Sequence, residues 1–310
     1  MFKHSLSLLV AIISFTSSCS SSFNTSKTSD DSINQELAKL EKVANGRIGI
    51  SAINTSNNQR IEYRANELFP FCSTSKVIAV SAILKKSEKH PNIMKQKLTY
   101  SKKDAEKSGY APITEKHIKD GMTISELSRA AIEYSDNAAM NLIIKFLGGP
   151  KAVNSYARSI GDNQFRIDRL EPELNSAIPN DVRDTTSPLA MSQTLQKIIL
   201  GDALKPKQCQ QLQAWLRNNT TGDSRIRKAV PRGWIVGDKT GTGDYGTTND
   251  IGIIWPSKCD APIVVTIYFT QNKKDASRRD DIVASATGLI IKELSKTNEC
   301  LKKSNLEPFL

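Results

Sequence analysis

The sequence predicts an α+β fold in which one antiparallel sheet, assembled from both ends of the chain, carries an inserted helical domain. Apolar residues alternate with other residues, as in strands, near the start of the chain and again after Pro231. Between Ser73 and about Leu216 they recur at the three- and four-residue spacing of helices. We therefore expect early and late strands to share a sheet, with the helical stretch as a second domain.

The first predicted elements are a helix and a β-hairpin. Residues 31–43 have helical periodicity, and residues 46–53 then alternate like a strand. Asn57-Asn58 marks a turn, so residues 59–64 are expected to be the partner strand. The apolar face of the helix would consist of Ile33, Leu37, Leu40 and Val43.

The rest of the chain divides into a helical stretch and a second group of strands. Helices are expected at residues 76–86, 123–134, 137–146, 151–160, 187–200 and 205–218. Between two of them, Asp162 to Asp184 shows little periodicity, and an internal loop of that length is usually functional or disordered. After Pro231, strands are expected at 234–239, 248–255 and 263–270, and a closing helix at 279–295.

Composition excludes several classes of function. The chain has 310 residues, and its formal net charge of +11 comes from scattered residues rather than from a basic block. Because no nucleic-acid motif accompanies this charge, we expect a basic protein surface and no nucleic-acid partner. The three histidines do not cluster with acidic residues, so neither a catalytic metal nor a cofactor is expected.

The N-terminus predicts export. A short basic start, an apolar segment from Leu6 to Phe15 and small polar residues are typical of a signal peptide, here residues 1–19. Cys19 loosely resembles the lipid-attachment site of bacterial lipoproteins, although Thr16 replaces the usual aliphatic residue three positions earlier. Cleavage near Ser18 or Ser22 is expected in either case, and lipidation of Cys19 stays open. Residues 20–31 are rich in Ser, Thr and Asp, which predicts a flexible tether.

The stretch Phe71-Cys72-Ser73-Thr74-Ser75-Lys76 is the first candidate for chemistry. Residues three apart lie on one face of a helix, so the amine of Lys76 would reach the hydroxyl of Ser73. A serine hydroxyl becomes a useful nucleophile only when a neighbour takes its proton. Unpaired backbone N–H groups at the start of a helix could also stabilise a developing oxyanion. By itself, this motif is also compatible with a capped helix and a solvated lysine.

Three further motifs follow in order. Ser135-Asp136-Asn137 could cap a helix, Lys239-Thr240-Gly241 could turn the chain, and Glu171-Pro172-Glu173-Leu174-Asn175 could be a solvated acidic turn. Their joint occurrence with Ser73 and Lys76 indicates a site instead. The serine–lysine, Ser-Asp-Asn and Lys-Thr-Gly motifs resemble those of class A β-lactamases and penicillin-binding proteins. The Glu171 segment resembles the class A β-lactamase signature in particular.

The resemblance to class A β-lactamases covers residues 32–298. It includes Arg183-Asp184-Thr185-Thr186, Asn219-Thr220-Thr221-Gly222 and the stretch from Gly237 to Asp250, and several stretches look closest to the extended-spectrum and carbapenem-hydrolysing branches. It implies the β-lactamase/D,D-peptidase fold, an α/β/α sandwich domain with an inserted all-helical domain. The expected division is 32–66 with 217–299 for the α/β domain, 67–216 for the helical domain and 300–310 for a tail.

The resemblance also assigns the catalytic roles. Ser73 would attack the lactam carbonyl, with the backbone N–H groups of Ser73 and Thr242 as the oxyanion hole. Lys76 would either accept the Ser73 proton or orient the network as a charge. Ser135 would pass a proton to the lactam nitrogen. Glu171 would activate the water that releases the acyl group.

The remaining site residues would bind substrate or hold the loop. The resemblance implies that Asn137 binds the acylamide side chain and that Lys239 and Thr240 bind the substrate carboxylate. The supporting substrate-site residues would be Tyr110 as a cleft wall, Asn175 on the water, Arg225 near the carboxylate, and Gly241 and Thr242 on the strand. Arg169 and Asp184 would form an ion pair that pins both ends of the loop.

The cysteines depart from the carbapenemase pattern. In that branch a cysteine beside the nucleophile pairs with one just after Lys-Thr-Gly, but here Thr242-Gly243-Asp244 offers no partner for Cys72. We therefore expect Cys72 to be a small buried thiol and leave carbapenem hydrolysis open. The spacing of Cys209, Cys259 and Cys300 does not decide whether any of them pair.

The expected function is hydrolysis of penicillins and cephalosporins, and hence β-lactam resistance, by an exported monomer that is periplasmic or membrane-anchored. A penicillin-binding D,D-peptidase shares the serine–lysine chemistry but lacks the Glu171 loop. A β-lactam sensor would acylate and stay acylated, and a nucleic-acid-binding module has only net charge in its favour. Many turnovers of a chromogenic cephalosporin distinguish a hydrolase from all three.

Overall fold

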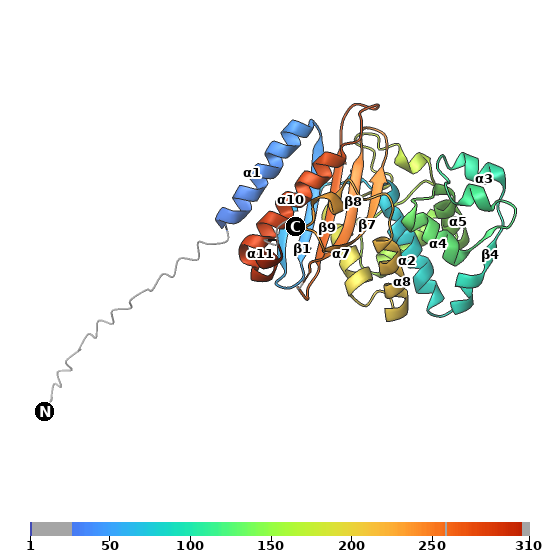
Figure 1. Ribbon diagram of the computed structural model, residues 1–310, viewed down its shortest axis with the longest axis horizontal. Coiled ribbons are helices and arrows are strands. Elements are labelled where there is room, and N and C mark those ends of the chain that lie inside the picture. The colour runs from blue at the N-terminus through green and yellow to red at the C-terminus, as the bar shows by residue number, and fades with distance from the viewer. Residues whose placement is uncertain (2–26, 258, 306–310) are drawn as a thin grey trace.

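The computed structural model describes Met1, residues 27–257 and residues 259–305 (Figure 1). The predicted signal peptide, apart from Met1, and Cys19 lie outside the described residues. The central element is a five-stranded antiparallel sheet with strand order β2-β1-β9-β8-β7. Its strands are β1 (Arg47–Asn54), β2 (Gln59–Tyr63), β7 (Ile235–Thr242), β8 (Thr248–Trp255) and β9 (Ile263–Thr270). The predicted α+β fold, with one sheet assembled from both ends of the chain, is confirmed.

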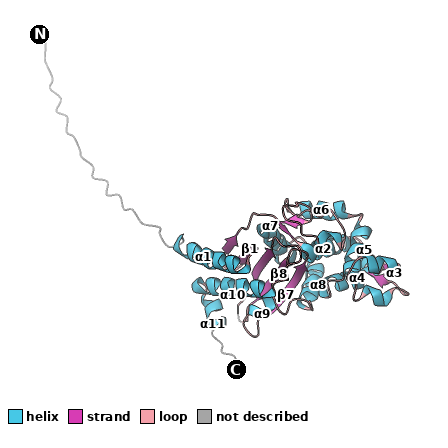
Figure 2. Cartoon of the chain, turned by 90° about the horizontal axis from the view of Figure 1, so that it is seen from above, coloured by secondary structure: helices cyan, strands magenta, loops and turns pink. Residues whose placement is uncertain are grey.

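Helices cover both faces of this sheet. Helices α1 (Lys27–Ala44) and α10 (Asp280–Thr297) lie on one face, as Figure 2 shows from above, and α7 (Pro188–Leu195) packs against β1 and β9 on the other. Seven of the eight residues of β1 are buried, and β8 and β9 are buried to the same extent. Strands covered on both sides tend to be apolar throughout, which explains the Ile- and Val-rich central strands.

The helical part of the chain gathers beyond β7 (Figures 1 and 2). At its centre, α2 (Lys76–Ser87) has ten of twelve residues buried and contacts its neighbours α4, α5 and α6. The helices around it are α3 (Lys102–Lys107), α4 (Ile124–Glu133), α5 (Asn137–Leu147), α6 (Pro150–Ser159) and α8 (Pro206–Arg217). Because α2 starts at the sheet and runs into this helical core, the residues at its beginning lie where the two parts meet.

Short elements complete the described chain. Two small antiparallel pairs join β3 (Phe69–Pro70) to β6 (Thr185–Thr186) and β4 (Lys97–Leu98) to β5 (Met122–Thr123). A π-helical turn, Gln196–Leu200, continues α7, and the short helix α9 (Ile226–Ala229) precedes β7. Within residues 27–257 and 259–305, no helix combines the length and apolar character required to span a bilayer.

The structure differs from the sequence-based expectation at the ends of the chain. Helix α1 begins at Lys27, inside the segment predicted as a tether, and Val43 is 75% exposed while Ala44 takes the buried position. Residues Glu299–Asn305 form helix α11 where a tail was expected. Helix α7 packs on the sheet although its sequence lies within 67–216, whereas the domain boundaries themselves stay a prediction.

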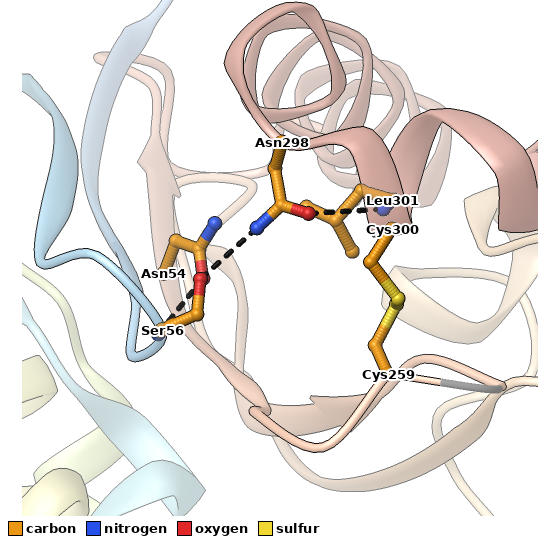
Figure 3. Close-up of a disulfide and its surroundings, with 6 residues drawn as sticks. All are labelled: Asn54, Ser56, Cys259, Asn298, Cys300 and Leu301. Carbon is orange, nitrogen blue, oxygen red and sulfur yellow. Dashed lines mark hydrogen bonds between the residues drawn. A yellow bond between two sulfur atoms is a disulfide. The ribbon is translucent and has the colours of Figure 1, made fainter.

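A disulfide between Cys259 and Cys300 explains the order near the C-terminus (Figure 3). The two Cα atoms are 5.8 Å apart although 41 residues separate them in sequence. Next to the bond, Asn298 Nδ2 donates to Ser56 Oγ at 3.0 Å, and Asn298 Oδ1 accepts from the Leu301 N–H at 3.1 Å. The disulfide thus links α11 to the β8–β9 connection. Asn298, just before α11, links the same helix to the β1–β2 turn through Ser56. Cys72 and Cys209 are free thiols.

Candidate active site

Ser73 lies in a 3₁₀ turn, Cys72–Ser75, directly before α2. The turn is closed at Phe71, whose carbonyl accepts from the N–H of Thr74 at 3.2 Å and from its hydroxyl at 2.8 Å. Lys76 is the first residue of α2, and its Nζ donates to Ser73 Oγ at 2.6 Å. The three-residue spacing therefore brings amine and hydroxyl together as predicted, although Ser73 lies in the 3₁₀ turn before α2 and not in α2 itself.

The ammonium group of Lys76 is fully buried and surrounded by acceptors. Its Nζ lies 2.8 Å from Glu171 Oε1, 2.7 Å from Asn137 Oδ1 and 3.0 Å from the carbonyl oxygen of Ser135. Both side chains of the Lys76–Glu171 ion pair are 0% exposed. A buried charge is tolerated only when it is paired and hydrogen-bonded, so these partners determine how the surrounding segments can meet.

Glu171 is held from two sides. Asn175 Nδ2 donates to its Oε2, and its Oε1 also lies 3.3 Å from Ser73 Oγ. The backbone of Glu171 is fixed by Asn141 on α5, whose Oδ1 accepts from the Glu171 N–H at 2.9 Å and whose Nδ2 donates to the Glu171 carbonyl at 2.8 Å. Sequence reasoning missed Asn141, although it lies four residues after Asn137 on the same face of an apolar helix.

The loop that carries Glu171 is closed by Asp184. Arg169 Nε donates to Asp184 Oδ2 at 2.5 Å, and Asp184 Oδ1 accepts from the N–H groups of Asp168 at 2.7 Å and Arg169 at 3.0 Å. The Asp184 carboxylate is 1% exposed. Arg166 and Thr185 add a pair of backbone hydrogen bonds between the two ends. The predicted pair of Arg169 and Asp184 is therefore brought together, within a wider set of contacts.

Ser135 connects the two lysines of the site. Its hydroxyl accepts from Lys239 Nζ at 3.0 Å and lies 3.5 Å from Lys76 Nζ, and its backbone φ is +58°. The next residue, Asp136, caps α5 by accepting from the Ala139 N–H at 2.9 Å. Burial, followed by the positive charge of Lys76, holds the pKa of Lys239 well below the ordinary lysine value.

Asn137 and Tyr110 are joined through their backbones. The Asn137 N–H donates to the Tyr110 carbonyl at 2.8 Å, and Asn137 Nδ2 donates to the Ser108 carbonyl at 2.9 Å. The side chain of Tyr110 is 52% exposed, whereas Asn137 is buried. The ring of Tyr110 is therefore open to solvent at the edge of the site, whereas the side-chain amide of Asn137 lies in its interior.

Strand β7 approaches the Ser73 turn closely at Gly241. A Cβ atom at this position would lie 2.6 Å from the Phe71 carbonyl oxygen, so only glycine permits the contact. Beyond it, Gly243 is packed just as closely, because a Cβ there would lie 2.5 Å from the Asn175 carbonyl oxygen and 2.7 Å from Cys72 Sγ. Cys72 is the buried free thiol that we expected, and burial raises its pKa above the ordinary cysteine value.

Arg225 forms hydrogen bonds with the C-terminal end of β7. It is buried, and its Nη1 donates to the carbonyls of Gly241 at 2.9 Å and Asn249 at 2.6 Å. Its Nη2 donates to Thr242 Oγ1 at 2.7 Å, while its Nε donates to Asp280 Oδ1 at 2.8 Å. Sequence reasoning did not identify Asp280, the carboxylate that fixes this arginine.

A cavity of about 710 Å³ elsewhere in the molecule contains none of these groups. It is bordered by Arg47, Arg64 and Glu67 on one side and by residues 177–182 of the Glu171 loop on the other. A smaller cavity of about 290 Å³ reaches Glu171 from the side of α5 and includes Asn141. The convergence of nucleophile, buried amine and carboxylate, rather than cavity size, therefore identifies the candidate active site.

The chain is similar to proteins of known function over most of its length. Residues 32–294 match the model of the beta-lactamase enzyme family. The chain is 50% identical over 296 residues to a beta-lactamase of Proteus vulgaris, covering 96% of each, and 52% identical over 260 residues to beta-lactamase Toho-1 of Escherichia coli, covering 84% of this chain and 88% of the relative. Among solved structures, a beta-lactamase from Desulfarculus baarsii is similar with a TM-score of 0.84 and 43% identity, over 86% of this chain and 98% of the other.

Proposed function

Because the chain belongs to the beta-lactamase enzyme family, as a class A serine enzyme that hydrolyses β-lactam antibiotics and so gives resistance, we propose a mechanism through an ester on Ser73. Water activated by Glu171 then cleaves this ester. The observation that supports the mechanism is the meeting of three groups: Ser73 Oγ lies 2.6 Å from Lys76 Nζ and 3.3 Å from Glu171 Oε1.

In the acylation step, Ser73 Oγ attacks the lactam carbonyl and the lactam C–N bond breaks. The proton leaving Ser73 has two neighbours within reach: Glu171 directly, and Lys76 once its ammonium group has given up a proton. Ser135 passes a proton to the departing nitrogen, since its hydroxyl lies between the amines of Lys76 and Lys239. Backbone N–H groups of Ser73 and Thr242 stabilise the oxyanion.

In the deacylation step, Glu171 accepts a proton from water as the water attacks the ester carbonyl. Water is a poor nucleophile without such a base, and the base must be positioned accurately. Asn141, Asn175 and the Arg169–Asp184 pair supply that positioning. The buried Asn175 Oδ1 accepts no hydrogen bond from any described residue, so it is available to hold the same water.

Substrate binding uses the two walls of the site. Lys239 and Thr240 on β7 bind the substrate carboxylate, while Asn137 and Tyr110 contact the acylamide side chain on the opposite wall. Arg225 acts through Thr242: because its Nη2 donates to Thr242 Oγ1, the single hydroxyl proton of Thr242 is left for the substrate. The positive charge of Arg225 favours the carboxylate at the same time.

The covalent step is tested with Ser73→Ala. The substitution removes the attacking oxygen from a side chain that is 7% exposed, so the fold should persist while acylation is abolished. Intact-protein mass spectrometry after exposure to benzylpenicillin should show one adduct on the wild-type chain at early times and none on the variant. An adduct of the same mass on Ser73→Ala would refute the assignment.

The charge of Lys239 predicts an alkaline limb in the pH profile. Since burial lowers its pKa, the ammonium is lost as pH rises at values below those of an ordinary lysine, and binding of the anionic substrate weakens there. The kcat/KM for benzylpenicillin should therefore fall at alkaline pH. In Lys239→Arg, which stays protonated, the fall should move to higher pH. Coinciding profiles for the two proteins would contradict this role.

We further propose that the site accepts oxyimino-cephalosporins as well as penicillins. The proposal rests on Thr242, whose hydroxyl accepts from Arg225 at 2.7 Å and keeps its own proton for the substrate carboxylate. Cefotaxime should therefore be turned over measurably, as checked by the loss of its ultraviolet absorbance on ring opening. An active enzyme without cefotaxime turnover would rule the proposal out.

We also propose that the protein is exported to the periplasm and acts there as a monomer, either free or anchored to the membrane through Cys19. The Cys259–Cys300 disulfide supports an oxidising compartment. Fractionation, light scattering and the mass of the mature N-terminal peptide test this. The mass distinguishes a diacylglyceryl Cys19 from a free N-terminus, and a reduced protein retained in the cytoplasm would overturn the proposal.

A further inference from the structure

The turn Asn219-Thr220-Thr221-Gly222 links the two walls of the active site. Towards the helical wall, Thr220 donates from its N–H at 2.9 Å and from its hydroxyl at 2.8 Å to the carbonyl of Glu133, two residues before Ser135. Towards the sheet, Thr221 Oγ1 lies 2.6 Å from Thr240 Oγ1. The mechanism above assigns this turn no role, yet it touches a residue that binds the substrate carboxylate.

The orientation of Asn219 is determined by a buried carboxylate. Arg227 Nε donates to Asp238 Oδ1 at 2.6 Å, and Asn219 Nδ2 donates to Asp238 Oδ2 at 2.6 Å. Since the amide nitrogen faces Asp238, the amide oxygen must face Thr221, where it accepts from the N–H at 3.2 Å and from Oγ1 at 2.8 Å. A Cβ at Gly222 would overlap Asp238 Oδ2, which explains the glycine.

The hydrogen bonds that link Asn219, Thr221 and Thr240 leave Thr240 without a free proton for the substrate. A threonine hydroxyl has a single proton, and that of Thr221 is donated to Asn219 Oδ1. The 2.6 Å contact between the two hydroxyls then requires Thr240 to donate to Thr221. In this arrangement the Thr240 proton is committed to Thr221 and is not offered to a substrate carboxylate.

We propose that Thr221 is a positioning residue that reverses the direction of this hydrogen bond when an anionic substrate binds. Thr240 then donates its proton to the substrate carboxylate, and Thr221 donates to Thr240. Asn219 Oδ1 keeps the N–H of Thr221 as a donor, so the reversal leaves no buried acceptor without a partner. The inference rests on the proposed contact between Thr240 and the substrate carboxylate.

The reversed arrangement strengthens substrate binding. A hydroxyl that accepts a hydrogen bond becomes a better donor, and a bond to a carboxylate is stronger than one between neutral groups. Deacylation at Glu171 does not involve Thr221 or Thr240. Loss of the Thr221 hydroxyl should therefore appear in KM for substrates with a free carboxylate, with little change in kcat.

The test compares Thr221→Val, which keeps the shape and removes the hydroxyl, with Thr221→Ser, which restores it, and with Thr240→Val. For benzylpenicillin, Thr221→Val should raise KM about two- to fourfold and leave kcat unchanged, on the scale of the cooperative strengthening of one hydrogen bond to a charged group. Thr221→Ser should restore the wild-type KM. The acylation rate with benzylpenicillin methyl ester, which lacks the anionic carboxylate, should change less than about twofold in Thr221→Val.

The outcomes separate this inference from the proposed function. If Thr240→Val raises KM and Thr221→Val does not, the positioning role of Thr221 is wrong while the role of Thr240 stands. Equal losses for acid and ester, or no rescue by serine, would mean that Thr221 is only structural and would also overturn the inference. If Thr240→Val leaves KM unchanged, the proposed carboxylate contact itself fails. Circular dichroism and thermal unfolding of each variant verify that it is folded.

Discussion

The rest of the site depends on one buried ammonium group. Lys76 begins a helix that is buried almost throughout, so its charge has no access to solvent and must be satisfied by protein atoms. Its acceptors come from three separate segments: its own turn at Ser73, the connection at Ser135 and Asn137, and the loop at Glu171. Removing the partner of a buried charge typically costs about 3–5 kcal/mol, so these segments are held together by the lysine. The same contacts place a hydroxyl, an amine and a carboxylate within reach of one reacting carbonyl.

The Glu171 loop shows how an aperiodic segment can still be rigid. It contributes Phe165, Ile167 and Leu174 to the larger hydrophobic core, and polar contacts hold its ends and its middle. Asp184 closes the ends, and Asn141 holds the backbone of Glu171 from a helix that belongs to the rigid core. These contacts fix the position of the Glu171 carboxylate, and deacylation requires an accurately positioned base.

Much of this arrangement is predictable from sequence, because it rests on local spacing. Ser73 and Lys76 are three residues apart, and the strands of the sheet have recognisable patterns. Sequence reasoning missed two contacts between distant segments, Asn141 with Glu171 and Asp280 with Arg225. It left open a third, the pairing of Cys259 with Cys300, which are 41 residues apart. Val43 illustrates a local limit, since Ala44 continues the four-three-four spacing of the buried face and leaves the larger residue in solvent.

The most direct test of the account is the fate of the acyl group when Glu171 loses its ability to act as a base. In Glu171→Gln the side chain keeps its length, but it can no longer accept the proton of the attacking water. Stopped-flow measurement with nitrocefin should show a burst of one equivalent followed by negligible turnover. Mass spectrometry should then find a stable adduct on Ser73. If the variant instead turns over nitrocefin at the wild-type steady rate without accumulating an adduct, Glu171 is not the deacylating base and the mechanism is wrong.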